Sequence, residues 1–181
     1  MQRLGVIELA KLHLVKYPAP VLAGRAEEVE YSEELRPLAA RMFEIMYAAH
    51  GVGLAGPQVG LPIRIFVANT HAEPPGHELV AINPRIVASD GQVLNEEGCL
   101  SVPGLTCRIK RSAQVTIQAL DINGQEYTLA GEGLLARAFQ HETDHLDGVL
   151  IINRMSPVAR LGNRRLLKDL EEQYEGSADL T

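Results

Sequence analysis

The chain has 181 residues, of which 46% are hydrophobic and 22% charged, and these values fit one ordinary globular domain. Its net charge of −6 argues against a specific DNA-binding protein or a general nucleic-acid binder. With no apolar stretch of about 18 residues, no secretory signal pattern in Met1–Val15 and only two cysteines, the chain is expected in the cytoplasm, without a membrane helix or a disulfide framework.

The first predicted helix begins near Ser32, a good N-cap that is followed by two glutamates. Apolar residues then recur at helical spacing from Leu35 to Ala49. Proline is tolerated in the first turn of a helix but not in its interior, so Pro37 places the start at Ser32 or slightly later. The helix must end at the glycine-rich segment 51–53.

The middle of the chain is predicted to form strands. Residues 63–69 alternate in part, and the apolar run 79–82 leads into Asn83-Pro84. Residues 71–77 contain Pro74-Pro75-Gly76 and are expected to form a loop. Two further strands, 114–122 and 125–130, flank Asn123-Gly124, which is the strongest short hairpin signal in the chain.

A second helix is predicted over residues 132–146. A third follows Ser156-Pro157, because serine is a good N-cap and proline fits the first helical position. Strands cluster between helices without β-α-β alternation. The predicted fold class is therefore α+β, with mostly antiparallel strands packed around a central metal-binding helix and additional helices near both ends. We place a single catalytic domain at residues 1–175 and a frayed tail at 176–181.

The central helix carries the segment 140–145, Gln-His-Glu-Thr-Asp-His, which contains the pattern H-E-x-x-H. Residues four apart share one helix face, so His141 and His145 can reach one metal ion. Glu142 is rotated from His141 by about 100° and lies beside that metal, where it can move a proton from water to a leaving amine. Such a pattern arises by chance in roughly 2% of chains of this size, so it favours a metal site.

A catalytic metal needs a third protein ligand and an open position for water. The longer metzincin pattern, H-E-x-x-H-x-x-G-x-x-H, fits at Gly148 but has Ile151 in place of its last histidine, which disfavours a metzincin protease. The remaining candidates for the third ligand include Cys99, Cys107, Glu96, Glu97, His50 and Asp147.

Cys99 stands out by its setting, in the segment 96–104 that reads Glu-Glu-Gly-Cys-Leu-Ser-Val-Pro-Gly. A cysteine between a glycine and a short strand can bring its thiolate and the next backbone N–H to the same side of a tight bend. Thiolate is a good ligand for zinc or ferrous iron. An isolated cysteine is more often buried and inert, by about three to one, and Cys107 has only that interpretation.

A third segment contains Gly51, Gly53 and Gly56, which spell G-x-G-x-x-G. A dinucleotide-binding fingerprint must follow a strand and open a helix, whereas this segment follows a helix and is closed by Pro57. We interpret it as tight backbone that lets a substrate approach closely, with Gln58 offering an amide donor. A glycine-rich turn with a solvated Gln58 explains this segment alone equally well.

In this order, the three segments resemble those of the peptide deformylase family, which carries G-φ-G-L-A-A-x-Q, E-G-C-L-S and Q-H-E-x-D-H, where φ is apolar. Here they are residues 51–58, 97–101 and 140–145, and the resemblance extends over roughly residues 12–172. The intact E-G-C-L-S with a helix after it is similar to the bacterial form rather than the mitochondrial one. The sequence departs from the family at Gly56, a change expected to loosen the loop, and at Thr106, where some members carry an arginine at the rim of the peptide groove.

The resemblance implies a role for each matching residue. Cys99, His141 and His145 would be the metal ligands, and Glu142 the general acid/base. The side chain of Gln58 and the backbone N–H of Leu100 would stabilise the oxyanion. Gly53 would contact the backbone of the substrate.

The family removes the formyl group from N-terminal formyl-methionine of nascent chains and releases formate. The expected cofactor is one divalent metal ion, usually Fe²⁺, with Zn²⁺, Ni²⁺ or Co²⁺ as substitutes. The expected substrate is an N-formyl-methionyl nascent peptide. A ribosome contact through the C-terminal helix is a further hypothesis, based on the basic cluster Arg160, Arg164, Arg165 and Lys168, although a solvated helix face is favoured by about two to one.

Two alternatives follow from the residues. A zinc peptidase would cleave internal peptide bonds and use a carboxylate or histidine as its third ligand. A binding module with a closed structural zinc site would need four protein ligands, with Cys107 or another residue as the fourth.

Overall fold

The computed structural model describes residues 7–71 and 77–178. Its strands form one five-stranded sheet, in the order β1-β2-β3-β6-β7, and one two-stranded sheet, β4-β5, with antiparallel neighbours throughout. The strands are β1 (Gly53–Ala55), β2 (Ile65–Ala68), β3 (Leu79–Asp90), β4 (Val93–Cys99), β5 (Val102–Arg111), β6 (Gln114–Leu120) and β7 (Glu126–Glu132).

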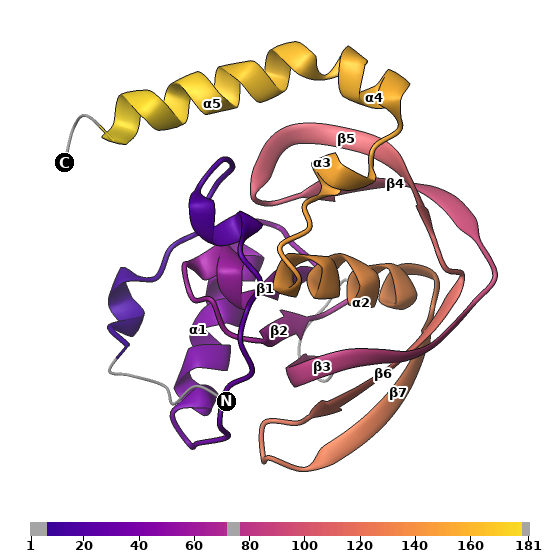
Figure 1. Ribbon diagram of the computed structural model, residues 1–181. Helices are drawn as coiled ribbons and strands as arrows, with labels where there is room; N and C mark the ends of the chain where they lie inside the picture. The colour runs from indigo at the N-terminus through magenta and orange to yellow at the C-terminus, as the bar shows by residue number, and fades with distance from the viewer. Residues whose placement is uncertain (1–6, 72–76, 179–181) are drawn as a thin grey trace.

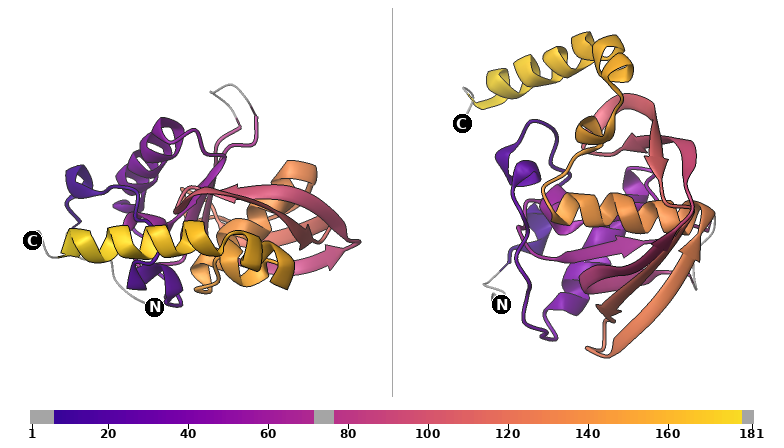
Figure 2. Two further views of the ribbon diagram at one scale, coloured as in Figure 1. Left: turned by 90° about the horizontal axis from the view of Figure 1, so that it is seen from above. Right: turned by 45° about the vertical axis from the view of Figure 1, so that its right-hand side comes forward.

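Helix α2 (Gly133–Leu146) lies between the two sheets, as Figures 1 and 2 show. The other α-helices are α1 (Leu35–Ala48), α3 (Ile151–Arg154), α4 (Pro157–Gly162) and α5 (Arg164–Ala178), and short 3₁₀ helices are η1 (Leu9–Lys11), η2 (Pro20–Ala23) and η3 (Gly56–Val59). The predicted α+β class with a central helix is confirmed. No helix in the described residues is both long and apolar enough to cross a membrane.

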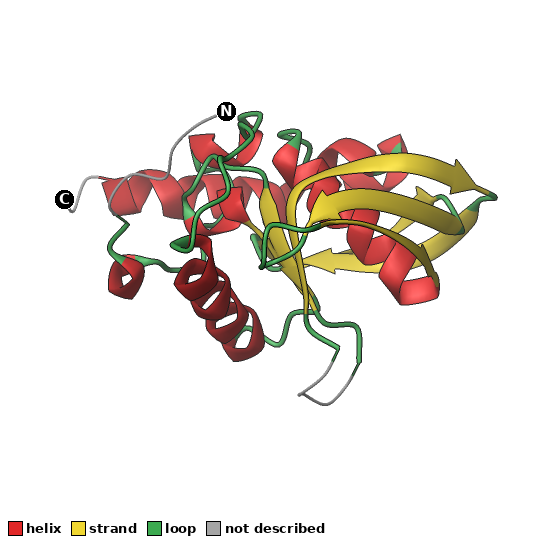
Figure 3. Ribbon diagram, turned by 90° about the horizontal axis from the view of Figure 1, so that it is seen from below, coloured by secondary structure: helices red, strands yellow, loops and turns green. Residues whose placement is uncertain are grey.

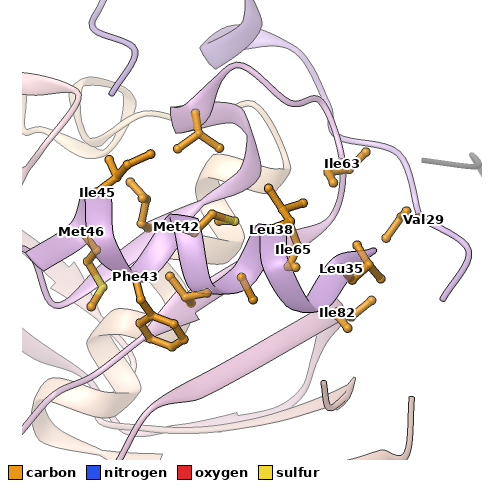
Figure 4. Packing of buried hydrophobic residues seen from close by; sticks show 14 residues of the cluster. Val29, Leu35, Leu38, Met42, Phe43, Ile45, Met46, Ile63, Ile65 and Ile82 are labelled. Carbon is orange, nitrogen blue, oxygen red and sulfur yellow. The ribbon is translucent and has the colours of Figure 1, made fainter. Parts of the chain in front are cut away.

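Helix α1 covers one side of the five-stranded sheet with its apolar face. Leu35, Leu38, Met42 and Met46 recur at helical spacing and are fully buried against residues of β1, β2 and β3 (Figure 4). Truncating one of these side chains to alanine would cost about 2–5 kcal/mol. The long strands gather on the side of the molecule away from α1 (Figure 3).

The start of α1 differs from the prediction. The N-cap residue is Glu34 rather than Ser32, and its side chain makes no capping hydrogen bond. Ser32 belongs to a preceding turn, in which its carbonyl oxygen accepts a hydrogen bond from the Leu35 N–H at 3.1 Å. Pro37 lies in the first turn of α1, where its missing N–H has no helical partner to lose.

Strand β3 is longer than predicted, because it continues past Asn83-Pro84 as far as Asp90. The register with β6 shifts between Ile82 and Arg85. Within this bulge Asn83 has a φ of 52°, and its side chain exchanges two 2.9 Å hydrogen bonds with the backbone of Val29. The bulge accommodates Pro84, which cannot donate to a regular ladder.

The β6–β7 hairpin around Asn123-Gly124 is confirmed. Helix α2 covers 133–146, as predicted, and α4 begins at Pro157, with the Ser156 hydroxyl accepting a hydrogen bond from the Ala159 N–H at 3.2 Å. The predicted loop lies largely outside the described residues, at 72–76. In the segment 176–181, α5 extends to Ala178 and the last three residues lie outside the described range.

Candidate metal centre

The three predicted ligands converge between α2 and the end of β4. The α2 periodicity places His141 and His145 one turn apart on the face toward β4. The β4–β5 register shifts between Gly98 and Cys99, so the chain bends sharply at Cys99. The candidate ligand atoms of the three residues all lie within 4.8 Å of one another, and Cys99 Sγ is 3.2 Å from His145 Nε2.

This donor set fits a divalent metal. One thiolate and two imidazoles suit Zn²⁺ or Fe²⁺ and leave at least one coordination position free of protein. Among the described residues the buried Oε2 of Glu142 has no hydrogen-bond partner, as expected for a group that acts on a further ligand. In the described part of the chain, no further cysteine, histidine or carboxylate joins these three residues as a fourth ligand. This disfavours the closed structural zinc site.

Glu97, a candidate ligand in the sequence, instead contacts His141, one of the three predicted ligands. Its carboxylate receives two 3.0 Å hydrogen bonds from Arg111, and its Oε2 is 3.2 Å from His141 Nδ1. Burial opposes the charge, but the hydrogen bonds from His141 and Arg111 prevail and lower the pKa of Glu97 to about 2. A carboxylate on Nδ1 leaves Nε2 of His141 as the nitrogen that is available to a metal.

A chain of ion pairs extends from Glu97 away from the candidate metal site. Arg111, whose side chain is 4% exposed, also donates to Asp144 at 2.5 Å. Asp144 accepts two more hydrogen bonds from Arg154, at 2.5 and 3.0 Å. Asp144, the aspartate of Q-H-E-x-D-H, therefore links α2 to β5 and α3 through its ion pairs with the two arginines. Nothing in the sequence pattern singled out Arg111.

Gln58 is held with its amide nitrogen toward Cys99, one of the predicted ligands. Its Oε1 accepts a hydrogen bond from the Ala55 N–H at 2.8 Å, which fixes the orientation of the amide. Its Nε2 donates to Ser101 Oγ at 3.2 Å and lies 3.8 Å from Cys99 Sγ. Gln58 is 1% exposed, so the alternative of a solvated side chain is wrong. Ser101 lies within E-G-C-L-S, but no pattern in the sequence predicts its contact with Gln58.

The three glycines of the segment 51–58 each allow a close approach of neighbouring atoms. A β-carbon on Gly53 would lie 2.3 Å from Glu142 Oε1, and one on Gly51 would lie 2.5 Å from the Leu100 side chain. A β-carbon on Gly56 would meet the carbonyl oxygen of Ile63 at 2.6 Å. Gly56 is buried, so in this chain it permits tight packing rather than loosening the loop.

Glu142 follows the predicted ligand His141 on α2 and is deeply buried. Burial raises the pKa of its carboxyl to about 7, against the opposing positive charges of His141 and Arg111. A carboxyl with this pKa can both accept and release a proton near neutral pH.

The ligand-bearing segments open onto a cavity of about 550 Å³. Gln58, Gly53, Leu100 and Glu142 line it together with apolar residues of α2, Leu134 and Ala138. Thr106, the second departure from the family pattern, is exposed and pairs with Gly98 across the β4–β5 hairpin. Among the described residues, Thr106 does not line this cavity.

The other third-ligand candidates, Glu96, His50 and Asp147, do not join the cluster among the described residues. Cys107 is a buried free thiol.

Comparison with known proteins gives one consistent match. The model of a family described as polypeptide deformylase matches residues 11–161. A peptide deformylase of Thermodesulfovibrio yellowstonii is 47% identical over 154 residues, which cover 84% of this chain and 93% of that protein. One of Acidobacterium capsulatum is 48% identical, with coverage of 86% and 93%. The crystal structure of a plant peptide deformylase 1B superposes with a TM-score of 0.91 at 39% identity, covering 96% of each chain.

Proposed function

The chain belongs to the polypeptide deformylase family, and we propose that Cys99, His141 and His145 hold its catalytic metal while Glu142 is its general acid/base. It is a metal-dependent hydrolase that removes the N-terminal formyl group of newly synthesised polypeptides and releases formate. The observation that supports the residue assignment is the convergence of the three ligand atoms within 4.8 Å, beside a buried glutamate.

When bound, the metal supplies a Lewis acid and a water of lowered pKa. Glu142 accepts a proton from the attacking water and transfers it to the departing α-amine. The charge that develops on the formyl oxygen is stabilised by Gln58 Nε2 and the backbone N–H of Leu100. Because Ala55 and Ser101 already hold the Gln58 amide, little reorganisation is needed during the reaction. The backbone of Gly53 contacts the peptide.

We assign Fe²⁺ as the metal in the cell, with Zn²⁺, Ni²⁺ and Co²⁺ as substitutes. The mixed thiolate and imidazole set supports this assignment, since borderline divalent metals accept both ligand types. The proposed location is the cytoplasm, with residues 1–175 as one catalytic domain and 176–181 as a tail. A ribosome contact is proposed through α4 and α5, on which Arg160, Arg164, Arg165 and Lys168 are exposed.

The proposal is tested by comparing formate release from a formyl-Met peptide with acetate release from the matched acetyl-Met peptide. A formyl carbon carries only hydrogen, whereas an acetyl methyl must overlap atoms of a site built closely around the carbonyl. Overpacking costs about 1–3 kcal/mol, which is roughly 5- to 150-fold in rate. Equal rates on both peptides would indicate a general aminoacylase, and cleavage of internal bonds in an unblocked control peptide would indicate a peptidase.

A further inference from the structure

A second cavity, of about 310 Å³, lies where the end of β5 meets α2 and α3. Its polar lining comes from the end of β5, from α2 and from the end of α3, and includes Lys110, Arg111, Ser112, Gln140, Asp144 and Arg154. None of the described residues that line it also lines the cavity at the candidate metal centre. The proposed reaction therefore leaves this second cavity without a role.

The lining of the second cavity carries an excess of positive charge. Lys110, Arg111 and Arg154 are cations, whereas Asp144 is the one carboxylate among the described lining residues. When Glu97, which pairs with Arg111, is counted as well, one positive charge still has no partner anion. The whole chain has a net charge of −6, so this local excess is opposite in sign to the charge of the protein. A cavity with such an excess attracts small anions.

Two of the three cations keep donors that no contact inside the protein uses. Arg154 donates to Asp144 from Nε and Nη2, at 3.0 and 2.5 Å, and neither bond involves its Nη1. The Lys110 ammonium forms no ion pair within residues 7–71 and 77–178. Asp144 also accepts a hydrogen bond from Arg111 at 2.5 Å, so two arginines compensate its charge and it opposes an incoming anion only weakly.

Gln140, the first residue of Q-H-E-x-D-H, holds one wall of this cavity in place. Its Oε1 accepts a hydrogen bond from the Ser112 N–H at 2.9 Å, and its Nε2 donates to the Ser112 carbonyl oxygen at 3.0 Å. These two bonds fix the backbone between β5 and β6, and neither uses the Ser112 hydroxyl. A hydroxyl beside an arginine and a lysine is a donor set that suits the oxygens of a phosphate group.

We propose that the second cavity binds a phosphate group, either as inorganic phosphate or as a phosphate monoester. Arg154 Nη1, the Lys110 ammonium and the Ser112 hydroxyl donate to its oxygens. The excess of cations favours a doubly charged anion over a monocarboxylate. A volume of about 310 Å³ also leaves room for part of an esterified group. This site is separate from the metal centre, so the proposal does not depend on the deformylase reaction.

The test is isothermal titration calorimetry of the metal-loaded protein with inorganic phosphate at constant ionic strength. Excess acetohydroxamate, a metal chelator, occupies the open metal position, where phosphate would otherwise bind as well. Wild-type protein should show one saturable phosphate site. Lys110→Ala should weaken binding about 10-fold or more, as expected on losing a hydrogen bond to a charged group.

Arg108→Ala is the matched control for loss of positive charge. Arg108 is exposed on β5 like Lys110 and lies two residues before it, on the same face of the strand. Among the described residues it does not line the second cavity. Its replacement should therefore leave the phosphate affinity at the wild-type value, whereas a diffuse electrostatic attraction to β5 would be weakened equally by both substitutions.

Arg154→Gln is a second variant and should also lose about 10-fold in affinity, with thermal unfolding as a check because Arg154 pairs with Asp144. Titration with adenosine 5′-monophosphate distinguishes the two sources, since tighter binding than inorganic phosphate indicates a monoester and weaker binding indicates the free ion. The proposal is overturned by the lack of a saturable phosphate site, by formate binding as tightly as phosphate, by wild-type affinity in Lys110→Ala, or by an equal loss in Arg108→Ala. Wild-type affinity in folded Arg154→Gln would overturn the role of Arg154.

Discussion

Gly53→Ala is expected to inactivate the enzyme while leaving its metal in place. The added methyl would lie 2.3 Å from Glu142 Oε1, 2.8 Å from Cδ and 3.0 Å from Cγ, so the clash falls on the whole end of the proposed acid/base. Glu142 is 3% exposed and packed within α2, which leaves its side chain little room to move. Relief therefore requires the carboxylate or the β1 backbone to shift.

The size of the effect follows from this geometry. Overpacking a closed site costs about 1–3 kcal/mol of stability, which a domain of this size can survive. A displacement of the catalytic group of about 1 Å can lower kcat by about 10²-fold. Among the described contacts, the nearest atoms to the new methyl belong to Glu142 and not to the three ligands, so metal content should remain near one per chain.

The assay combines formate release, metal content and thermal unfolding. Gly51→Ala is the matched control, because its methyl meets the far end of the Leu100 side chain, which can rotate away, and should cost less than about 10-fold in kcat. A Gly53→Ala protein with kcat within about 3-fold of wild type would refute the placement of Glu142 as acid/base. Loss of metal from a folded Gly53→Ala protein would show that Gly53 supports the ligands instead.

Three further substitutions separate the proposed roles. Glu142→Ala should keep near-stoichiometric metal while turnover falls by about 10² or more, and metal loss from the folded variant would make Glu142 a ligand. Gln58→Leu should lower kcat by about 10²–10³ with a smaller change in KM; a large KM rise at constant kcat would instead indicate uniform substrate binding. Arg111→Leu leaves Glu97 buried without its arginine and leaves Asp144 paired with Arg154 alone. Denaturant titration should then show a loss of about 3–5 kcal/mol, and chelator competition should show about 10- to 100-fold weaker metal binding. Wild-type values in both experiments would contradict this chain of ion pairs.

The elements that could be predicted were those with strong local signals. The apolar period of α1 and α2, the Asn123-Gly124 turn and the Ser156 cap each depend on neighbouring residues, and each appears in the structure. The same local reasoning misplaced the N-cap of α1, because the turn at Ser32 precedes the helix instead of starting it. It also ended β3 at Asn83-Pro84, since a bulge held by Val29 depends on a contact distant in sequence.

The β4–β5 hairpin was not predicted as such, although Leu105, Cys107, Ile109 and Arg111 are buried with a period of two. The polar and charged residues of the outer face obscure this alternation in the sequence. At the site, spacing on one helix revealed His141 and His145, and the family resemblance pointed to Cys99. Arg111 and Ser101 could not be found in this way, because their roles follow from which strands and helices meet in space.

The assignment of Cys99 as third ligand is tested most directly by preparing Cys99→Ser and Cys107→Ser side by side. Both thiols are buried and neither forms a disulfide. Both lie in the β4–β5 hairpin, so the two substitutions are closely matched. Metal content and formate release are measured on each protein. The structure predicts that Cys107→Ser keeps both and that Cys99→Ser loses most of both, because only Cys99 lies with His141 and His145. Metal loss from Cys107→Ser, with metal and turnover retained by Cys99→Ser, would contradict the proposed centre.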